Sequence, residues 1–243
     1  AGSTGALLTG ATLLVKRVKG GRRAAFGPVM PNKAGSKTLI IDCGANVECT
    51  PEFLLQFGVV GSLYARKAMG IAQPRVGLLN IGAEEEKGDT LRHETYALLK
   101  EAGEAGRIHF IGNVEANEAM MGTADVIVTD GFTGNVILKL TEGVAKMLLG
   151  MLKQMFLANL GGKLAYLLLK GSVADLKHQM DSEEYGGAPF LGAKQPVIKA
   201  HGSSKAKGIK NAIRQAKICV ENDLCGTMQS ALDELAAAQK TEE

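Results

Sequence analysis

The sequence predicts a three-layer α/β/α domain built on a mostly parallel sheet. Short apolar runs alternate along the chain with longer segments in which apolar residues recur every three or four positions. This alternation is typical of strands joined by helices that cover both faces of a sheet. The chain has 243 residues, of which 46% are hydrophobic, so it fits a single α/β domain over 1–243.

Each element can be assigned in order from its apolar spacing and its flanking turn residues. A helix is expected from Pro51 to about residue 69, because Pro followed by an acid is typical of a first helical turn. A second helix is expected over 84–100, and a long one begins at Gly134. The predicted strands are 38–42, 76–81, 108–111, 126–130 and 197–200.

A glycine accompanied by polar residues marks the end of every predicted strand. In an open α/β sheet these loops gather at the carboxyl edge, where glycine admits a ligand and helix N-termini attract anions. Such residues also form ordinary turns, but five similar loops favour a binding site. None fits the dinucleotide or P-loop patterns. The loops are 42–46, 80–84, 112–115, 130–135 and 201–204.

The segment 138–180 has a different character, with two helical stretches joined at Gly161 and Gly162. The first has a narrow polar stripe and is apolar elsewhere, with Met147, Met151 and Met155 on one face. This apolar band is too wide for a helix that covers one core face. We expect a helical hairpin for dimer contact, membrane contact or both, with plain core as the alternative. Each stretch is too short and interrupted for a membrane span.

The net charge of +3 conceals an uneven distribution. Residues 1–41 and 185–220 each hold seven cations and no acid, which leaves 14 cations and 25 acids elsewhere. Two basic blocks suit an acidic protein partner, because complementary charge steers association; a solvated basic face is the alternative. Aromatic residues make up only 5% of the chain and no recognition motif is present, so nucleic acid is not expected.

Cysteine spacing and the first residues bear on compartment and completeness. The four cysteines form neither CxxC nor a zinc pattern, so we expect free thiols in a reducing cytoplasm and no metal. A loop of small residues leads directly into an amphipathic pattern, without initiator Met or targeting peptide. We therefore expect that an N-terminal part is absent. The cysteines are Cys43, Cys49, Cys219 and Cys225.

Seven ordered motifs span nearly the whole chain: DCGAN at 42–46, NIG at 80–82, EKG at 86–88, GNVE at 112–115, DGFTGN at 130–135, YGGAP at 185–189 and HGSS at 201–204. Together they resemble the motifs of the bacterial phosphate acyltransferases of phospholipid synthesis. The opening residues 1–7 also resemble the family's Ala-Gly-Asn-Thr-Gly-Ala-Leu, with Ser3 in the Asn position. Family members have further β-α units upstream.

This resemblance implies transfer of a long-chain fatty acyl group from acyl carrier protein to inorganic phosphate, giving acyl phosphate. It implies a fold similar to phosphotransacetylases and isocitrate dehydrogenase-like enzymes. It further implies a homodimer, cytoplasmic and peripherally associated with the membrane, that needs no cofactor.

Phosphate is itself the nucleophile in this reaction, so the protein must supply positioning, charge neutralisation and an oxyanion stabiliser. We predict that Lys87 and Asn135 do so, one as a point charge and the other as a neutral donor. The alternatives are that Lys87 is an exposed helix lysine and that Asn135 is a helix N-cap. His201 is either a general base or a turn residue.

The other candidates are predicted to bind or orient substrate. Ser203 and Ser204 fit anion binding at a helix N-terminus better than a catalytic triad, because no GxSxG elbow is present. The remaining candidates are Ser3, Thr4, Gly5, Asn46, Asn80, Gly82, Asn113, Asp130 and Gly134.

Three other functions are considered. A coenzyme A-dependent phosphotransacetylase or phosphobutyryltransferase is the nearest, although the hydrophobic hairpin favours lipid-linked chemistry. A non-catalytic scaffold recruited to membranes is the second. A metal-dependent hydroxyacid dehydrogenase is the third, and it needs clustered Asp ligands that the sequence does not place.

Overall fold

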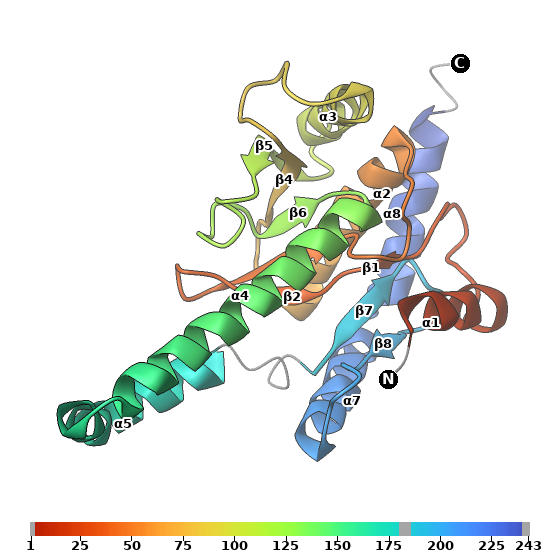
Figure 1. The fold of residues 1–243 in the computed structure, drawn as a ribbon. Coiled ribbons are helices and arrows are strands. Elements are labelled where there is room, and N and C mark those ends of the chain that lie inside the picture. Colours follow the sequence, from red (N-terminus) through yellow and green to blue (C-terminus); the bar gives the residue numbers. More distant parts are fainter. Residues whose placement is uncertain (1–2, 180–185, 240–243) are drawn as a thin grey trace.

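The computed structural model describes residues 3–179 and 186–239 and has a main sheet in the order β2-β3-β6-β4-β5 (Figure 1). β2 pairs antiparallel with β3, and the other pairs are parallel. The predicted α/β class with a mostly parallel sheet is therefore confirmed. The strands are β2 (Val29–Pro31), β3 (Lys37–Ile41), β4 (Arg75–Asn80), β5 (His109–Glu115) and β6 (Val126–Val128).

Both faces of this sheet are buried, which explains why its strands read as continuous apolar runs. In β3, Leu39 and Ile41 belong to one core cluster and Ile40 to another. In β6, Val126 and Ile127 divide between the two clusters in the same way. Successive side chains of a strand point to opposite faces, so each strand contributes to both cores.

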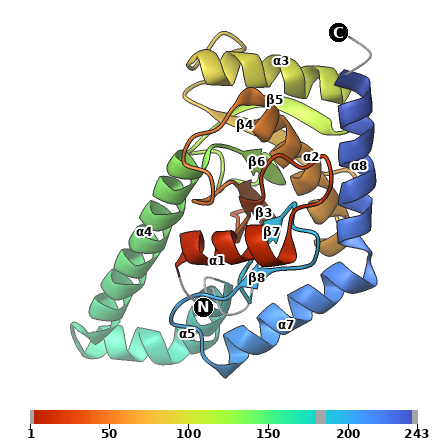
Figure 2. The same ribbon diagram turned by 90° about the vertical axis from the view of Figure 1, so that its right-hand side faces the viewer.

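Helices α2 (Pro51–Ala68) and α3 (Thr90–Glu104) cover the first face, and α8 (Leu224–Gln239) packs against α2 (Figure 2). Pro51 opens α2, where its missing N–H costs nothing. The middle of α2, residues 54–65, is buried throughout. This helix therefore forms the centre of the larger core, between the sheet and α8.

The remaining small elements lie beside the main sheet, and their residues divide between the two core clusters. β1 (Ala25–Phe26), β7 (Ala188–Leu191) and β8 (Ile198–Lys199) form a separate antiparallel sheet, with α7 (Ala206–Glu221) after it. The strand predicted at 197–200 thus belongs to this second sheet. The short helix α1 (Thr4–Gly10), which continues as a π-helix, lies beside it (Figure 2).

Three predicted boundaries differ from the structure. The helix predicted from residue 84 begins only at Thr90, after the N-cap Asp89, and residues 81–89 form a loop. The motif at 112–115 lies within β5, where Gly112 has φ +91°, and does not follow the strand. The long helix begins at Gly131, because Asp130 caps it.

The hairpin segment consists of α4 (Gly131–Leu157) and α5 (Leu160–Gln179), which project from the body (Figure 1). The joint is at 158–159, not at the glycine pair. Gly162 lies within α5, where an added Cβ would come 2.8 Å from the carbonyl oxygen of Met155. Large apolar side chains are exposed along both helices, including Leu160 at 83% and Leu168 at 80%. No helix among the described residues is long and apolar enough to cross a membrane.

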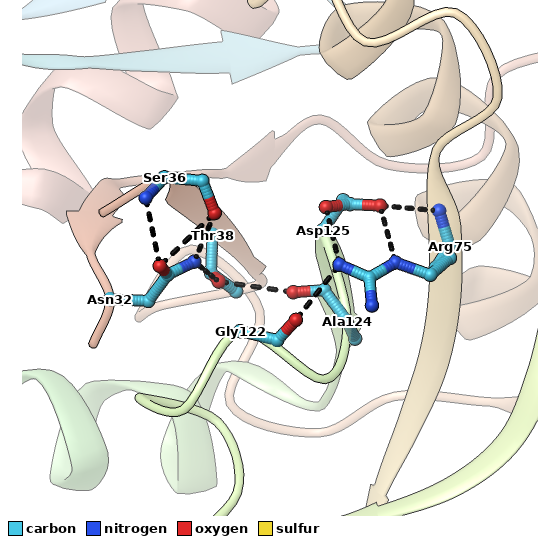
Figure 3. A network of polar contacts seen from close by, with 7 residues as sticks. All are labelled: Asn32, Ser36, Thr38, Arg75, Gly122, Ala124 and Asp125. Carbon is cyan, nitrogen blue, oxygen red and sulfur yellow. Dashed lines mark hydrogen bonds and ion pairs between the residues drawn. The ribbon is translucent and has the colours of Figure 1, made fainter. Parts of the chain in front are cut away.

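A polar network joins the segments at which the parallel strands β3, β4 and β6 begin, at one edge of the main sheet (Figure 3). The guanidinium of Arg75 donates to Asp125 at 3.0 Å from both Nε and Nη2, and to the Gly122 carbonyl oxygen at 2.8 Å. Burial alone would raise the pKa of Asp125, but the hydrogen bonds and charge of Arg75 outweigh it and lower that pKa. This carboxylate therefore stabilises the fold in its ionised form.

We expect Asp125→Asn to lower the free energy of unfolding at neutral pH by about 1–3 kcal/mol, because hydrogen bonds to a charged group are lost. This loss in the free energy of unfolding, relative to the unsubstituted chain, should have its full size above the unfolded-state pKa of about 4. It should disappear as the pH falls through the lowered folded-state pKa. Urea unfolding at several pH values measures both.

Glu85→Gln is the matched control, because Glu85 pairs with Lys100 at 3.3 Å on an exposed surface. Its effect should stay below about 0.5 kcal/mol. Equal effects of the two substitutions at every pH would contradict the role given to Asp125.

Candidate active site

The first turn of α4 lies directly on the loop that follows β3. The Gly131 N–H donates to the carbonyl oxygen of Asn46 at 2.7 Å. A Cβ added to Gly134 would overlap the carbonyl oxygen of Asp42. Backbone therefore meets backbone at this point, and only glycine leaves enough room for it.

The buried Asp42 carboxylate organises this loop. Its Oδ1 accepts from the N–H groups of Phe26 and Ala45 at 2.9 and 3.1 Å. Its Oδ2 accepts from the backbone N–H and the side-chain amide of Asn46 at 2.6 and 2.9 Å. Burial raises the pKa of Asp42, and these four hydrogen bonds oppose that shift. Asn46 also donates to the Ala24 carbonyl oxygen at 2.9 Å, so its amide holds the loop.

The two other predicted asparagines fasten the loop that carries Lys87. The amide of Asn80 donates to the Lys87 carbonyl oxygen at 2.8 Å, and the amide of Asn113 donates to the Glu84 carbonyl oxygen at 2.8 Å. Gly88 has φ +100°, and a Cβ there would come 2.6 Å from Asn80 Oδ1. Because of these contacts, residues 81–88 form a loop, and the helix predicted from residue 84 does not begin there.

Lys87 is therefore a loop residue with a fixed backbone and an exposed side chain. Gly82 packs against it, since an added Cβ would lie 2.9 Å from Lys87 Cγ. The helix expected at Lys87 is therefore wrong, while its side chain is exposed as the alternative expected. The side chain can reach a ligand at the carboxyl edge while its backbone stays in place.

Asn135 lies in the first turn of α4, beside Gly44 of the loop after β3. A Cβ on Gly44, which has φ +113°, would lie 3.5 Å from Asn135 Oδ1. The helix N-cap is Asp130, whose Oδ1 accepts from the Thr133 N–H at 2.8 Å. The N-cap alternative for Asn135 is therefore wrong, and its exposed amide is free of that role.

Arg92 is a residue of this region that the sequence analysis missed. It pairs with Asp89, the N-cap of α3, at 3.1 Å, and with Asp130, the N-cap of α4. It thereby links the loop of Lys87 to the helix of Asn135. The spacing of Asp89 and Arg92 is a visible signal of a local pair, but the bond to Asp130 spans 38 residues.

A second group of predicted residues gathers at the small sheet. Thr4 accepts a hydrogen bond from Lys199 Nζ at 2.5 Å. His201 Nδ1 lies 2.8 Å from Ser203 Oγ, and the His201 carbonyl oxygen accepts from the Ser204 N–H at 3.0 Å. Phe26 connects the two groups, because its N–H reaches Asp42 while its ring lies under Lys199.

Two predicted residues at the N-terminus have no side-chain role in this second group. Ser3 precedes α1 but makes no side-chain capping bond, and Gly5 lies within that helix. Residues 1–2 and Tyr185, which belong to the motifs, lie outside the described residues. The structure thus brings together most predicted residues, but at two adjoining places.

The cysteine in the loop after β3 does not offer a nucleophile. Burial first, and then the nearby charge of Asp42, raise the pKa of Cys43 well above its usual value. A neutral buried thiol is inert. All four cysteines are free thiols. Within the described ranges, no group of three or more His, Cys, Asp or Glu side chains is placed to hold a metal ion.

We expect Gly134→Ala to destabilise the protein by about 1–3 kcal/mol, because the added methyl group forces α4 away from the loop after β3. Gly143→Ala in the same helix is the matched control, since nothing lies within 4 Å of its added Cβ. The control should instead gain about 0.5–1 kcal/mol from helix propensity. Thermal and urea unfolding compare the stabilities of the two variants. A Gly134→Ala variant as stable as the unsubstituted chain would contradict the close approach.

Comparisons with known proteins identify the family of the chain. The family described as "Fatty acid synthesis protein" matches residues 1–227. A phosphate acyltransferase of Clostridium acetobutylicum is 48% identical over 235 residues, covering 97% of this chain and 70% of the relative. One of Clostridium perfringens is 51% identical over 232 residues, covering 96% and 67%.

Two solved structures share the fold. A phosphotransacetylase from Streptococcus pyogenes has a TM-score of 0.60 at 18% identity and covers 90% of this chain and 61% of its own. A branched-chain phosphotransacylase from Enterococcus faecalis has a TM-score of 0.52 at 17% identity and covers 86% and 69%. The chain therefore belongs to the fatty acid synthesis protein family and, within it, to the phosphate acyltransferases, which are acyl-transferring enzymes.

Proposed function

We propose that the chain transfers a long-chain fatty acyl group from acyl carrier protein to inorganic phosphate, giving acyl phosphate for phospholipid synthesis. Family membership supports the reaction type. One observation carries the assignment of the site: Arg92 joins the N-caps of α3 and α4, so the loop of Lys87 and the first turn with Asn135 are held at one edge.

The reaction joins a phosphate oxygen to the thioester carbonyl carbon and forms a tetrahedral oxyanion. The C–S bond then breaks, and the thiolate leaves and takes up a proton. Lys87 would neutralise phosphate, and Asn135 would donate to the oxyanion without adding charge. We propose His201 as the base that accepts any proton left on the attacking phosphate.

The other predicted residues would act in two ways. Asn46, Asn80 and Asn113 would orient substrate through the loops that they hold, as would Gly82, Asp130 and Gly134. Ser203 and Ser204, with Ser3, Thr4 and Gly5, would contact anionic groups of substrate at the small sheet.

An acidic carrier protein is the proposed acyl donor, and helix α7 supports it. Lys210 and Arg214 are exposed on this helix, beside Ile209 and Ile213. An apolar pair bordered by cations suits an acidic protein surface. A coenzyme A thioester is the alternative donor, since the solved structures with this fold are named phosphotransacetylase and phosphotransacylase.

We expect acyl phosphate, trapped with hydroxylamine, when the chain with any upstream part restored receives phosphate and a long-chain acyl carrier protein thioester. Lys87→Ala and Asn135→Ala should each lower kcat/KM by about 100-fold or more. Lys100→Ala, an exposed lysine paired with Glu85, is the control and should keep the full rate.

The donor is identified by repeating the assay with the coenzyme A thioester. A higher kcat/KM with that donor would favour the alternative. Product from neither donor would reject the enzyme and favour a scaffold.

We further propose that the hairpin of α4 and α5 makes a homodimer contact and touches the cytoplasmic membrane surface. A cavity of about 750 Å³ between the two helices is lined mainly by leucines and aromatic rings. Its border includes Lys153, Lys163 and Lys177. Exposed apolar surface of this extent is typical of an interface, and the lysines suit anionic lipid headgroups.

We expect the double substitution Leu167→Glu and Leu168→Glu to reduce binding to vesicles of anionic lipid by about tenfold or more, because two exposed leucines that would insert into the lipid are replaced by anions. Vesicle flotation measures this, and sedimentation measures the oligomeric state. Ile213→Glu is the control, with 66% exposure against 68% for Leu167. Unchanged flotation would reject the membrane role, and an unchanged dimer would place the subunit contact elsewhere.

A further inference from the structure

A small pocket between α4 and the antiparallel sheet has a mixed lining that the proposed chemistry at Lys87 and Asn135 does not use. Its volume is about 110 Å³. One side is apolar, with Phe26, Pro28 and Leu138, and the other is polar, with Lys139, Lys199 and His201 and with one acid, Glu142. A concave site with apolar walls and a few converging polar groups is the usual form of a small-ligand site.

Lys199 is the central cation of this pocket. It lies at the end of β8 and is half-buried, with Nζ 4.7 Å from the centroid of the Phe26 ring. Nζ donates to the Thr4 hydroxyl at 2.5 Å. That hydroxyl accepts from the ammonium group, which leaves its own proton available to donate to a ligand.

The charges around Lys199 are not balanced. Among the described residues, no carboxylate lies within ion-pairing distance of it, and the nearby Glu142 pairs with Lys139 at 3.0 Å. Burial, and next the positive charge of Lys139, lower the pKa of Lys199, against the opposing effect of Glu142. An anion between the two lysines would remove this repulsion.

We propose that this pocket binds a phosphoryl group, with Lys199 as its principal cation and Lys139 and the Thr4 hydroxyl as further donors. A phosphoryl group has several oxygens that can accept from converging donors at once. Lys139 follows Asn135 by one helical turn, so the ligand would adjoin the proposed acyl transfer site. The inference deepens the proposed function: the phosphoryl group is inorganic phosphate or a phosphoester of the acyl donor.

Calorimetric titration with inorganic phosphate, without any acyl donor, tests the pocket. Lys199→Met should weaken phosphate binding by about tenfold or more, because a charge-assisted hydrogen bond is lost. Lys199→Arg should retain most of the affinity, since it keeps the charge. Lys194→Met is the control: this lysine is exposed and lines a different cavity in the same segment.

The acyl transfer assay separates the two sources. If phosphate affinity is unchanged but Lys199→Met raises KM for the acyl donor about tenfold, the pocket holds a phosphoester of that donor. If neither quantity changes in Lys199→Met with an unaltered melting temperature, the proposal is overturned.

Direct phosphate binding needs no turnover. A chain that makes no acyl phosphate, yet loses phosphate affinity on Lys199→Met, would refute the proposed reaction and leave the pocket standing. A chain that makes acyl phosphate at the full rate and keeps its phosphate affinity with Lys199→Met would support the reaction and refute the pocket.

Discussion

The site depends on one close approach, that of the first turn of α4 to the loop after β3. Gly131 and Gly134 bring the helix backbone against the backbone of that loop. This contact sets the position of Asn135 beside Gly44 and, one turn later, the position of Lys139 beside the small sheet. It also sets the direction of the whole hairpin, because α4 continues without a break to Leu157. Asp42 stabilises this contact, because its four hydrogen bonds fix the shape of the loop against which the helix packs.

The parallel core could be predicted from the sequence because burial on both faces leaves strands of unbroken apolar character. Of the small strands, β8 lies within the strand predicted at 197–200, whereas β1 and β7 were not predicted, because runs of two and four residues are too short to show a clear periodicity. The early start predicted for α3 failed for a different reason. Glu84–Lys87 are good helix formers, but Asn80 and Asn113 take the carbonyl groups of Lys87 and Glu84, and one of those contacts joins segments 29 residues apart.

The candidate site was predictable only as residue types at strand ends. Lys87 and Asn135 belong to glycine-containing motifs that follow strands, and that pattern reveals them, as does the family resemblance. Arg92 and Lys199 belong to no such motif, since one lies inside a helix and the other inside a basic block. Their importance comes from partners far along the chain: Asp130 for Arg92, and Thr4, 195 residues away, for Lys199. Local spacing contains no information about such contacts, so only the folded arrangement identifies them.

The folded structure divides the cations of the two basic blocks into two kinds. Most of their cations are exposed and contribute to a general positive field, which would steer the proposed acidic partner. Lys199 differs because its ammonium group faces a pocket. Desolvation there raises the free energy of an unpaired charge and strengthens its interaction with an anion. The exposed cations would therefore attract the proposed partner from a distance, whereas Lys199 would select the ligand that enters the pocket. On this proposal the block 185–220 serves both approach and recognition, because Lys199, the last residue of β8, faces the pocket before α7 begins.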